Sequence, residues 1–528
     1  MKQKVFFILA LLFFGVTQGV EAQTHVSKLK TRTADAEKWT FSPNPAEEGA
    51  TVTATYAGRK KVMSVQAEKN PYTDLSMVDC AGNERQSQWT ANCYMVHTAG
   101  KYRLPLVYGN AIKNGEANTS AYIGPDNPIE FMSKLRTKTF PNHTGNAINA
   151  PWITKSTSGS GVDQGMGISV ASAELLWQDA KGLVTEVGIK GDYLTLTVGK
   201  NATEQEGNAV VAAKDANGTI VWSWHIWVTR QTFAADDLAT INTGQHTYTL
   251  TPVNLGWVGD VMSRGYCTYY QWGRKDAFSP ADFNNITTEG GETIGGGGGG
   301  GMGNEGWQTG TTTYAGDLTV YDINNDTIQN PVTVYHDEYS SSTTIATNIK
   351  NPTTMYWCDK YINGSNTHVV TTPNKELYIN MWNAQQPVTK NSDPDIIYIN
   401  SNIAEATVKT VYDPCPPGFC VPTDNLYDYI ADIDSVSFSF SEDFVGRQLT
   451  TATPNVFFPC VGRRAYDTGR VTSVNSGGLF SATAVAPNNP DRYGLTRSAI
   501  FFSFGKKTTG RTRVNFSFGY PVRAVAEE

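Results

Sequence analysis

The segment from Tyr269 to Lys275 has the residue types best suited to binding chemistry. It reads YYQWGRK, so flat aromatic rings stand next to two cations. Exposed rings flanked by polar groups stack on sugars or anchor a protein partner, and we take Tyr270, Trp272 and Arg274 as candidate binding residues. Tyr and Trp also bury their ring bodies often. The pattern therefore predicts either a binding surface or a buried ring cluster, and the buried cluster is favoured.

One acidic segment resembles the first half of a calcium loop. Asp322, Asn324 and Asp326 place oxygen atoms at positions 1, 3 and 5 of that pattern. Thr327 stands where the loop requires Gly, and Thr333 stands where its bidentate Glu belongs. A turn rich in Asn and Asp is the better interpretation. We expect no metal site and no cofactor.

The remaining titratable residues form no catalytic pattern. The 7 histidines are spread singly along the chain, and the usual zinc-protease, phosphate-loop and serine-hydrolase motifs do not occur. His225 lies between tryptophans on an expected strand, where a packed side chain is favoured over a catalytic one. With 49 Asp and Glu residues, a carboxylate pair can arise by chance. We expect no enzymatic activity.

The chain has 7 cysteines, a sparse and odd number. Cys80 and Cys93 are candidates for one disulfide, and Cys415 and Cys420, which flank Pro-Pro-Gly-Phe, for another. Neither spacing matches a zinc site. These residues are interpreted as short disulfide staples or as buried thiols, and at least one thiol stays unpaired within the chain.

Composition and charge favour a β-rich exported protein. The 528 residues carry 42 Lys and Arg against 49 Asp and Glu, a net charge of −7. This balance, without a basic cluster, argues against nucleic-acid binding. Charged residues are only 17% of the chain, while it has 49 glycines, 24 prolines and 11% aromatic residues. Low charge with many aromatics and turn formers is typical of strands joined by tight turns.

The first 22 residues have the pattern of a signal peptide. Lys2 and Lys4 precede a short apolar stretch, and Val20 and Ala22 supply the small residues that allow cleavage before Gln23. A buried N-terminal helix or an uncleaved anchor is the alternative. No later segment reaches about eighteen apolar residues, so we expect no transmembrane segment in the mature chain. The expected location is the cell surface or the extracellular space, with the periplasm as an alternative.

The first half of the chain predicts β-structure in two steps. Residues 23–38 are expected to form a flexible lead-in and residues 39–88 a small β unit, in which 51–56 alternates with period two. Residues 89–231 are expected to form a β-sandwich. Its strands are 193–198, 208–214 and 220–229, and an Asn-Gly turn joins the last two in a hairpin. Trp222, Trp224, Ile226 and Val228 are expected on one strand face, opposite Ser223, His225 and Trp227.

Residues 232–528 are expected to form an α+β domain. A Gly-rich loop at 290–306 holds seven consecutive glycines, which have high backbone entropy and favour a surface loop. Thr423 is placed to cap a short helix over 424–434, with Leu426, Tyr429 and Ile430 facing inward. Strands follow near the end. The expected fold class is mostly β, with N-terminal β-sandwich units and an α+β C-terminal part.

Several longer blocks resemble two known groups of proteins. Resemblance to fimbrillin-family surface proteins of Bacteroidetes rests on ANCYMVHTAG (91–100), LVYGN (106–110), GNAVVAAKD (207–215) and IVWSWHIWVT (220–229). Resemblance to the Fibrobacter succinogenes major paralogous domain rests on YQWGRKDAF (270–278), KTVYDPCPPGF (409–419) and GYPVR (519–523). The resemblance implies an exported, non-catalytic surface protein with a C-type-lectin-like C-terminal domain. Trp382-Asn-Ala384 lacks the acid of the calcium-dependent lectin element, so calcium-dependent sugar binding is not expected.

These observations lead to one main functional hypothesis and two alternatives. The main hypothesis is an exported cell-surface binding or structural protein in adhesion, whose partners are surface glycans or other envelope or fimbrial proteins. One alternative is a glycan-active enzyme with an accessory β-sandwich, which predicts two convergent carboxylates or a metal in a cleft. The other is a fimbrial tip or accessory subunit, which predicts that the first strand can be exchanged with a partner.

Overall fold

The computed structural model covers the chain in segments. The described residues are 39–42, 51–56, 59–64, 71–126, 136–244, 246–260, 265–289, 312–338, 343–361, 369–376, 378–386, 406–432, 438–441, 445–450, 452–485, 498–505 and 509–528. The expected signal peptide (1–22), the lead-in (23–38) and the Gly-rich loop (290–306) lie outside the described residues.

The chain folds as two compact units, Met1–Thr73 and Asp74–Glu528. In the first unit, β1 (Trp39–Ser42), β2 (Thr51–Tyr56) and β3 (Arg59–Ser64) form an antiparallel sheet in the order β1-β2-β3. The expected strand over 51–56 is confirmed. The boundary lies at Thr73 rather than at residue 88.

Residues 74–88 belong to the larger unit because their side chains are fixed there. Asp74 caps the 3-10 turn η2 (Leu75–Met77) by accepting a hydrogen bond from the Ser76 amide. The same carboxylate forms an ion pair with Arg103 at 3.1 Å. Leu75 is part of the main hydrophobic core. The apolar and charged groups of this segment therefore lie in the second unit.

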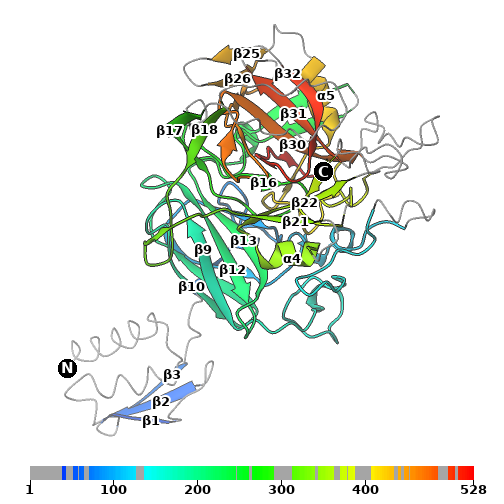
Figure 1. The fold of residues 1–528 in the computed structure, drawn as a ribbon. Helices are drawn as coiled ribbons and strands as arrows, with labels where there is room; N and C mark the ends of the chain where they lie inside the picture. Colours follow the sequence, from blue (N-terminus) through cyan, green and yellow to red (C-terminus); the bar gives the residue numbers. More distant parts are fainter. Residues whose placement is uncertain are drawn as a thin grey trace. The chain divides into compact units, whose positions relative to one another are not determined.

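Two sheets form a sandwich in the larger unit (Figure 1). Their strands are β4 (Thr73–Asp74), β5 (Cys93–Val96), β6 (Gly100–Pro105), β9 (Ser172–Gln178), β10 (Val184–Lys190), β11 (Tyr193–Val198), β12 (Gly207–Lys214), β13 (Ile220–Val228), β19 (Val320–Tyr321) and β20 (Thr327–Ile328). One sheet has the order β10-β11-β6-β4 and the other β20-β19-β9-β12-β13-β5. Contacts of β10 with β9 and β12 join the two sheets. The β-sandwich expected in this region is therefore present.

The predicted hairpin and the strand before it are confirmed. β12 and β13 pair antiparallel, with Val211 opposite Trp224. In the turn between them, Asp215 accepts hydrogen bonds from the amides of Asn217 and Thr219, and Gly218 adopts φ +80°. That backbone conformation favours glycine, which explains the Asn-Gly signal.

β13 is covered on both of its faces. Every residue from Val221 to Val228 is buried. Trp222 and Ser223 lie on opposite faces of the strand, and Ser223 is covered by the side chains of Lys275 and Asp276. The C-terminal part of the chain therefore supplies the cover for the sandwich.

Strand pairing extends across the expected domain boundary between residues 231 and 232. β19 and β20, from beyond the Gly-rich region, extend the six-stranded sandwich sheet through the pairing of Tyr321 with Gln178. The side chain of Gln178 donates to the Asp322 carbonyl at 3.0 Å. Asn325 accepts a hydrogen bond from the Gly182 amide at 2.6 Å. Residues 89–231 are therefore not a separate domain.

The turn at 322–326 between β19 and β20 is the Asn/Asp-rich turn that the sequence favoured. One oxygen of Asp322 accepts hydrogen bonds from the amides of Asn324 and Asp326, at 2.9 and 2.8 Å. The carboxylate is thus used to close the turn.

The C-terminal part adds further small sheets. Their strands are β14 (Ala239–Asn242), β15 (Thr247–Leu250), β16 (Tyr270–Gln271), β17 (Ala281–Glu289), β18 (Thr312–Asp317), β21 (Thr333–Glu338), β22 (Thr354–Tyr361), β23 (Val369–Thr372), β24 (Phe419–Cys420), β25 (Phe438–Ser441), β26 (Gly446–Leu449), β27 (Val456–Pro459), β28 (Arg463–Arg464), β29 (Val471–Thr472), β30 (Ser476–Val485), β31 (Ser498–Gly505), β32 (Thr509–Asn515), β33 (Gly519–Tyr520) and β34 (Val525–Ala526). The sheet orders are β14-β15-β34-β24, β16-β33-β28-β29-β18-β17, β21-β22-β23, β25-β26-β27 and β30-β31-β32.

Described helical and minor elements are η3 (Thr119–Ala121), η4 (Gly161–Asp163), η5 (Ala235–Asp237), α4 (Ile345–Lys350), α5 (Asp424–Asp432) and the hairpin of β7 (Ile112–Lys113) with β8 (Glu116–Ala117). The fold is mostly β, as expected.

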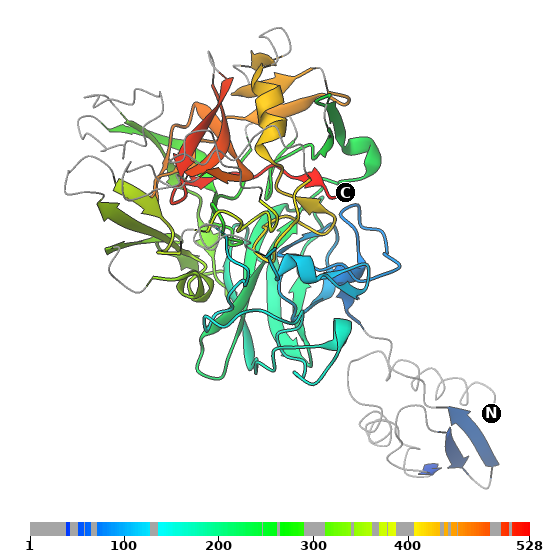
Figure 2. The same cartoon turned by 90° about the vertical axis from the view of Figure 1, so that its right-hand side faces the viewer.

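Helix α5 packs on β31 and β32, as Figure 2 shows near the top of the molecule. Leu426 and Ile430 are fully buried, as predicted. The prediction for Tyr429 is wrong, because 36% of this residue is exposed and Tyr427 faces inward instead. The rings of Tyr427 and Phe502 stack with their centroids 5.5 Å apart. The buried face of the helix therefore includes Tyr427 beside Leu426. The predicted residues 433–434 lie outside the described residues.

The sandwich and the C-terminal part share one hydrophobic core. Trp222 of β13 packs against Tyr412, with ring centroids 5.9 Å apart. Asn92 donates hydrogen bonds from its side chain to the carbonyls of Val411 and Asp413 at 2.7 and 2.8 Å. The blocks 91–110 and 409–419, which carried two different resemblances, thus contact each other.

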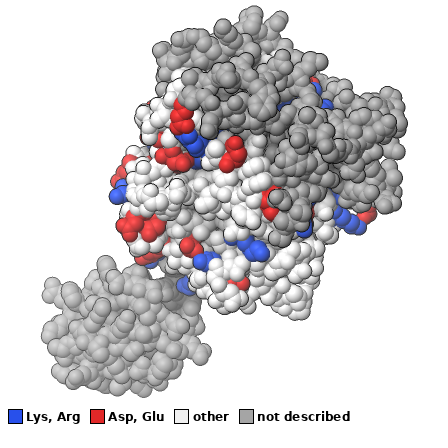
Figure 3. All heavy atoms as spheres, viewed as in Figure 1, with Lys and Arg blue, Asp and Glu red and all other residues white. Residues whose placement is uncertain are grey.

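Among the described residues, no helix is both long enough and apolar enough to span a membrane. On the face in Figure 3, acidic and basic side chains are interspersed across the described surface.

Candidate binding pocket

The predicted ring cluster lies inside the protein. Tyr270, Trp272 and Arg274 are 0%, 2% and 4% exposed. Trp272 stacks on Phe516 with centroids 4.4 Å apart, and its indole nitrogen donates to the Ser481 carbonyl at 2.9 Å. An exposed platform made of these three residues is therefore contradicted, and the buried cluster that the sequence favoured is found.

Arg274 fastens several segments to one another. Its Nη1 donates to the side-chain oxygen of Gln271 at 2.8 Å and to the Thr354 carbonyl at 2.7 Å. Its Nη2 pairs with Asp276 at 3.2 Å and donates to the Asn351 carbonyl at 3.2 Å. Burial lowers the pKa of the guanidinium, and the Asp276 charge opposes that shift. The guanidinium of Arg274 therefore uses its hydrogen bonds to hold the backbone around α4 in place.

Lys275 and Asp276 form a second buried link, to the sandwich. The Lys275 ammonium lies 2.7 Å from Asp276 Oδ1, donates to the Ser223 carbonyl at 3.1 Å and sits 4.5 Å from the Trp222 ring centroid. Burial lowers the pKa of Lys275, while Asp276 opposes that shift. Asp276 also accepts a hydrogen bond from the Ser223 hydroxyl at 2.9 Å. These charges hold the C-terminal part against β13.

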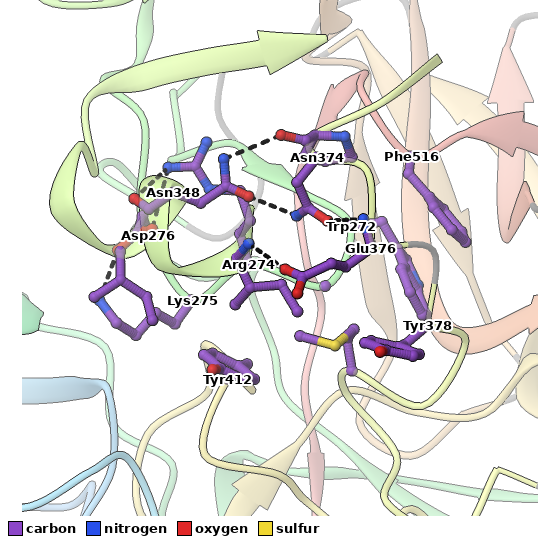
Figure 4. A pocket seen from close by; sticks show the side chains of 15 residues that line it. Trp272, Arg274, Lys275, Asp276, Asn348, Asn374, Glu376, Tyr378, Tyr412 and Phe516 are labelled. Carbon is purple, nitrogen blue, oxygen red and sulfur yellow. Dashed lines mark hydrogen bonds and ion pairs between the residues drawn. The ribbon is translucent and has the colours of Figure 1, made fainter. Parts of the chain in front are cut away.

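Trp272 and Arg274 nevertheless line a pocket, which we call the α4 pocket. It lies between the turn 272–276, helix α4 and residues 373–376 and 378–381, with Tyr412 and Phe516 completing its walls (Figure 4). Its cavity volume is about 30 Å³. The pocket therefore admits a small chemical group rather than a whole drug-sized ligand.

Glu376 is the carboxylate of this pocket that sequence reasoning missed. One oxygen, Oε2, accepts a hydrogen bond from the Ile345 amide at the start of α4, at 2.6 Å. Figure 4 shows the carboxylate directed into the space above Tyr412. The Glu376 amide donates to the Asn374 side chain at 3.0 Å, and Asn374 donates to the Asn348 side chain at 2.6 Å. This chain of hydrogen bonds fixes the position of the carboxylate.

Helix α4 itself begins with a capping box. The Thr344 hydroxyl accepts a hydrogen bond from the Thr347 amide at 3.3 Å, and the Thr347 hydroxyl accepts one from the Thr344 amide at 3.2 Å. Such a box satisfies amides that the first helical turn leaves unpaired. The wall of the pocket is thus a locally stabilised element.

An exposed ring, that of Tyr335, lies on β21, which pairs parallel with β22. Tyr335 is 51% exposed and contacts Tyr356 edge-on at 5.5 Å. On the other strand face, His336 stacks on Trp357 at 3.7 Å. The sequence separates these pairs by 21 residues and gives no turn signal for a parallel pairing. The sequence analysis therefore missed them.

The expected disulfides are absent, since Cys80, Cys93, Cys415 and Cys420 are buried free thiols. The 415–420 loop is held by Asp413 instead. Its carboxylate accepts hydrogen bonds from the amides of Cys415 and Val421 at 2.7 and 2.9 Å. The disulfide interpretation is thus corrected, and the alternative of buried thiols applies. The remaining cysteines, Cys267, Cys358 and Cys460, are also buried and form no disulfide.

His225 is buried in a polar network, as a packed histidine is expected to be. Its Nε2 lies 2.9 Å from the side-chain oxygen of Asn208, so Nε2 carries the proton. Its Nδ1 then accepts from the Tyr270 hydroxyl at 3.3 Å. Burial lowers the pKa of His225 to about 3, so the ring is neutral at physiological pH.

Across the described segments, no three His, Cys, Asp or Glu side chains gather in a way that could hold a metal ion. Comparison with known proteins gives no family model that matches the chain, no matching curated protein and no matching solved structure.

Proposed function

We propose that this chain is an exported binding or structural protein of the cell surface that acts in adhesion, and that it is not an enzyme. The signal-peptide pattern of residues 1–22 and the low charge content support export. The resemblances to fimbrillin-family proteins and to the Fibrobacter succinogenes major paralogous domain support a surface role. A C-type-lectin-like layout of the C-terminal part belongs to this proposal, and its small sheets with the short helix α5 are compatible with it.

One observation carries the proposal: the buried charges beside the pocket are used to hold the fold together. Asp276 is bound by Arg274, Lys275 and the Ser223 hydroxyl. A general acid or base must instead reach the reacting group of a substrate. The carboxylate pair of Asp276 and Glu376 is therefore a poor fit to glycan hydrolysis, because one member is buried and fully engaged.

The arrangement of the first strand does not favour the fimbrial-subunit alternative. β1 pairs with β2 inside its own three-stranded sheet, along the full length of β1. A strand that is to be exchanged with a partner is more simply supplied by an unpaired segment. We therefore keep adhesion as the proposed role.

The test is a glycan-array screen of the purified exported chain, with and without EDTA, together with protease shaving of intact cells that produce it. Binding that resists EDTA, and loss of the chain on shaving, are the expected results. Binding that EDTA abolishes would show that recognition needs a metal ion and would overturn the metal-independent part of the proposal. A chain protected from the protease on intact cells would contradict the surface location. Release of a modified glycan product from the array would show an enzyme.

A further inference from the structure

We propose that the α4 pocket receives a neutral hydroxyl-bearing group of a carbohydrate, which donates a hydrogen bond to the carboxylate of Glu376. The inference rests on the proposed function in surface binding, and it names the ligand class and the residue that recognises it. It differs from calcium-dependent sugar recognition, because the acceptor is a protein carboxylate without an ion.

The first step of the argument is that Glu376 is held in place before any ligand arrives. Oε2 is anchored by the Ile345 amide at 2.6 Å, and the Glu376 backbone is anchored by Asn374 at 3.0 Å. With one oxygen used for the anchor, the carboxylate still has acceptor capacity on the side that Figure 4 shows facing the pocket. An acceptor fixed in this way loses little conformational entropy on binding.

The second step is the chemistry of the walls. Tyr378, Trp272 and Phe516 form one side of the pocket, and Tyr412 forms another. Met381 also lines the pocket. The CH₂ group of a hydroxymethyl arm packs well against such rings, while its hydroxyl requires an acceptor such as Glu376. A wall of rings with one fixed carboxylate fits a polyol better than it fits a purely apolar group.

The third step is charge. The lining contains two cations, Arg274 and Lys275, and two carboxylates, Asp276 and Glu376. The cations are paired with Asp276 and with fold carbonyls. Formal charges therefore cancel around the pocket, so a charged ligand gains little net Coulomb energy. A neutral hydrogen-bond donor does not rely on net Coulomb attraction, so the cancelled charges do not weaken its binding.

The fourth step is size. The cavity volume of the pocket is about 30 Å³. That space suits a hydroxyl or hydroxymethyl arm, with the rest of the sugar outside the pocket. Affinity for a single sugar unit is then expected to be weak, in the range of about 1 mM.

The test uses the full chain in EDTA, with saturation-transfer NMR and titration calorimetry. The probes are the methyl glycosides of glucose, galactose, mannose and N-acetylglucosamine. Choline and acetate serve as the charged probes. We expect at least one glycoside to bind and both charged probes to fail. Stronger binding of choline or acetate than of every glycoside would overturn the proposal.

The decisive variant is Glu376→Gln. The amide oxygen of Gln can still accept from the Ile345 amide, while the group facing the pocket becomes an NH₂ donor. We expect about tenfold weaker glycoside binding with an unchanged melting temperature. Glu289→Gln on the exposed edge of β17 is the matched control and is expected to bind as the parent does. Equal binding by Glu376→Gln would overturn the assignment.

A second variant covers the case in which Glu376→Gln does not fold. Tyr378→Ala removes a partly buried wall ring and is expected to weaken glycoside binding by a similar factor. Unchanged binding by Tyr378→Ala would then reject the site. The glycan array separates the two levels of proposal. Array binding that is the same in parent and pocket variants would reject this site but keep surface binding, whereas a parent that binds neither array glycans nor glycosides would reject both.

Discussion

Asp179 accepts two hydrogen bonds from the single residue Asn208, one from its backbone amide at 2.6 Å and one from its side-chain amide at 2.8 Å. Asn208 also donates to the Gly256 carbonyl at 2.9 Å and accepts from His225. This buried network joins the sandwich to the beginning of the C-terminal part. Burial raises the pKa of Asp179 to about 7, although the Asn208 hydrogen bonds oppose the shift.

The raised pKa of Asp179 makes stability depend on pH. Because the folded protein holds this proton more tightly than the unfolded chain, the free energy of unfolding falls as pH rises from about 4 to about 7, and then levels off. Asp179→Asn removes this term. From pH 5 to pH 8, the free energy of unfolding of the variant, measured by urea denaturation, is expected to rise relative to that of the parent by roughly 2–3 kcal/mol. A parent–variant difference that does not change with pH would contradict the raised pKa.

Arg274→Lys is expected to destabilise the protein strongly. A lysine keeps the positive charge but cannot supply the planar set of donors that reaches Gln271, Thr354 and Asn351. Breaking such a buried arrangement costs about 3 kcal/mol or more in the free energy of unfolding. Arg470→Lys is the control, since Arg470 pairs with Glu289 at the surface and the change is expected to cost less than about 1 kcal/mol. Similar urea midpoints for the two variants would argue against the anchoring role of Arg274.

Gly109→Ala tests the contact between the sandwich and residues 409–413. Gly109 has φ +43°, and a Cβ atom there would lie 2.4 Å from the Val411 carbonyl oxygen. Gly191 has φ +58° with open space around it, so Gly191→Ala isolates the backbone cost of about 1–2 kcal/mol. Gly109→Ala is expected to lose at least about 2 kcal/mol more in thermal or urea unfolding. Equal losses would mean that the two segments are less closely packed than described.

The thiols are expected to be unreactive until the protein unfolds. All 7 cysteines are buried and outside any disulfide, and burial raises the pKa of Cys80, Cys267 and Cys460 to about 12. Since the thiolate is the reactive form, native protein should resist alkylation at pH 8. Intact-mass measurement is expected to show no added groups in the native state and 7 after denaturation without reductant. Fewer than 7 groups after denaturation would reveal a disulfide.

Short-range sequence signals predicted the hairpin strands of the sandwich, whereas long-range packing determined how they are covered. The hairpin of β12 and β13 follows from alternation and an Asn-Gly turn, both of which act over a few residues. The cover on the second face of β13 comes from Lys275 and Asp276, about 50 residues later in the chain, and no periodicity reports it. The wrong prediction for Tyr429 has the same cause. Its helix is oriented by the contact of Tyr427 with Phe502 in a distant strand, and helical periodicity does not report that contact.

The pocket was predictable only in part. Trp272 and Arg274 drew attention as a ring beside a cation, and both do line the pocket. Glu376 has no distinctive neighbours in the sequence, and its position depends on Ile345, 31 residues earlier. A site assembled from separate turns, a helix and a strand end leaves no compact motif. The disulfide prediction failed because spacing cannot show that Asp413 already closes the 415–420 loop.

The threading of the chain has a consequence for its order of assembly. Translation proceeds from the N-terminus, yet the six-stranded sandwich sheet takes its outer strands β19 and β20 from residues 320–328. β34, at residues 525–526, pairs with β15 through Leu250 and with β24 through Cys420. The six-stranded sheet cannot be completed before residue 328 has been made, and the sheet that contains β34 cannot be completed before residue 526 has been made. The complete set of strand pairings in the larger unit therefore forms only after nearly all of the chain has been synthesised.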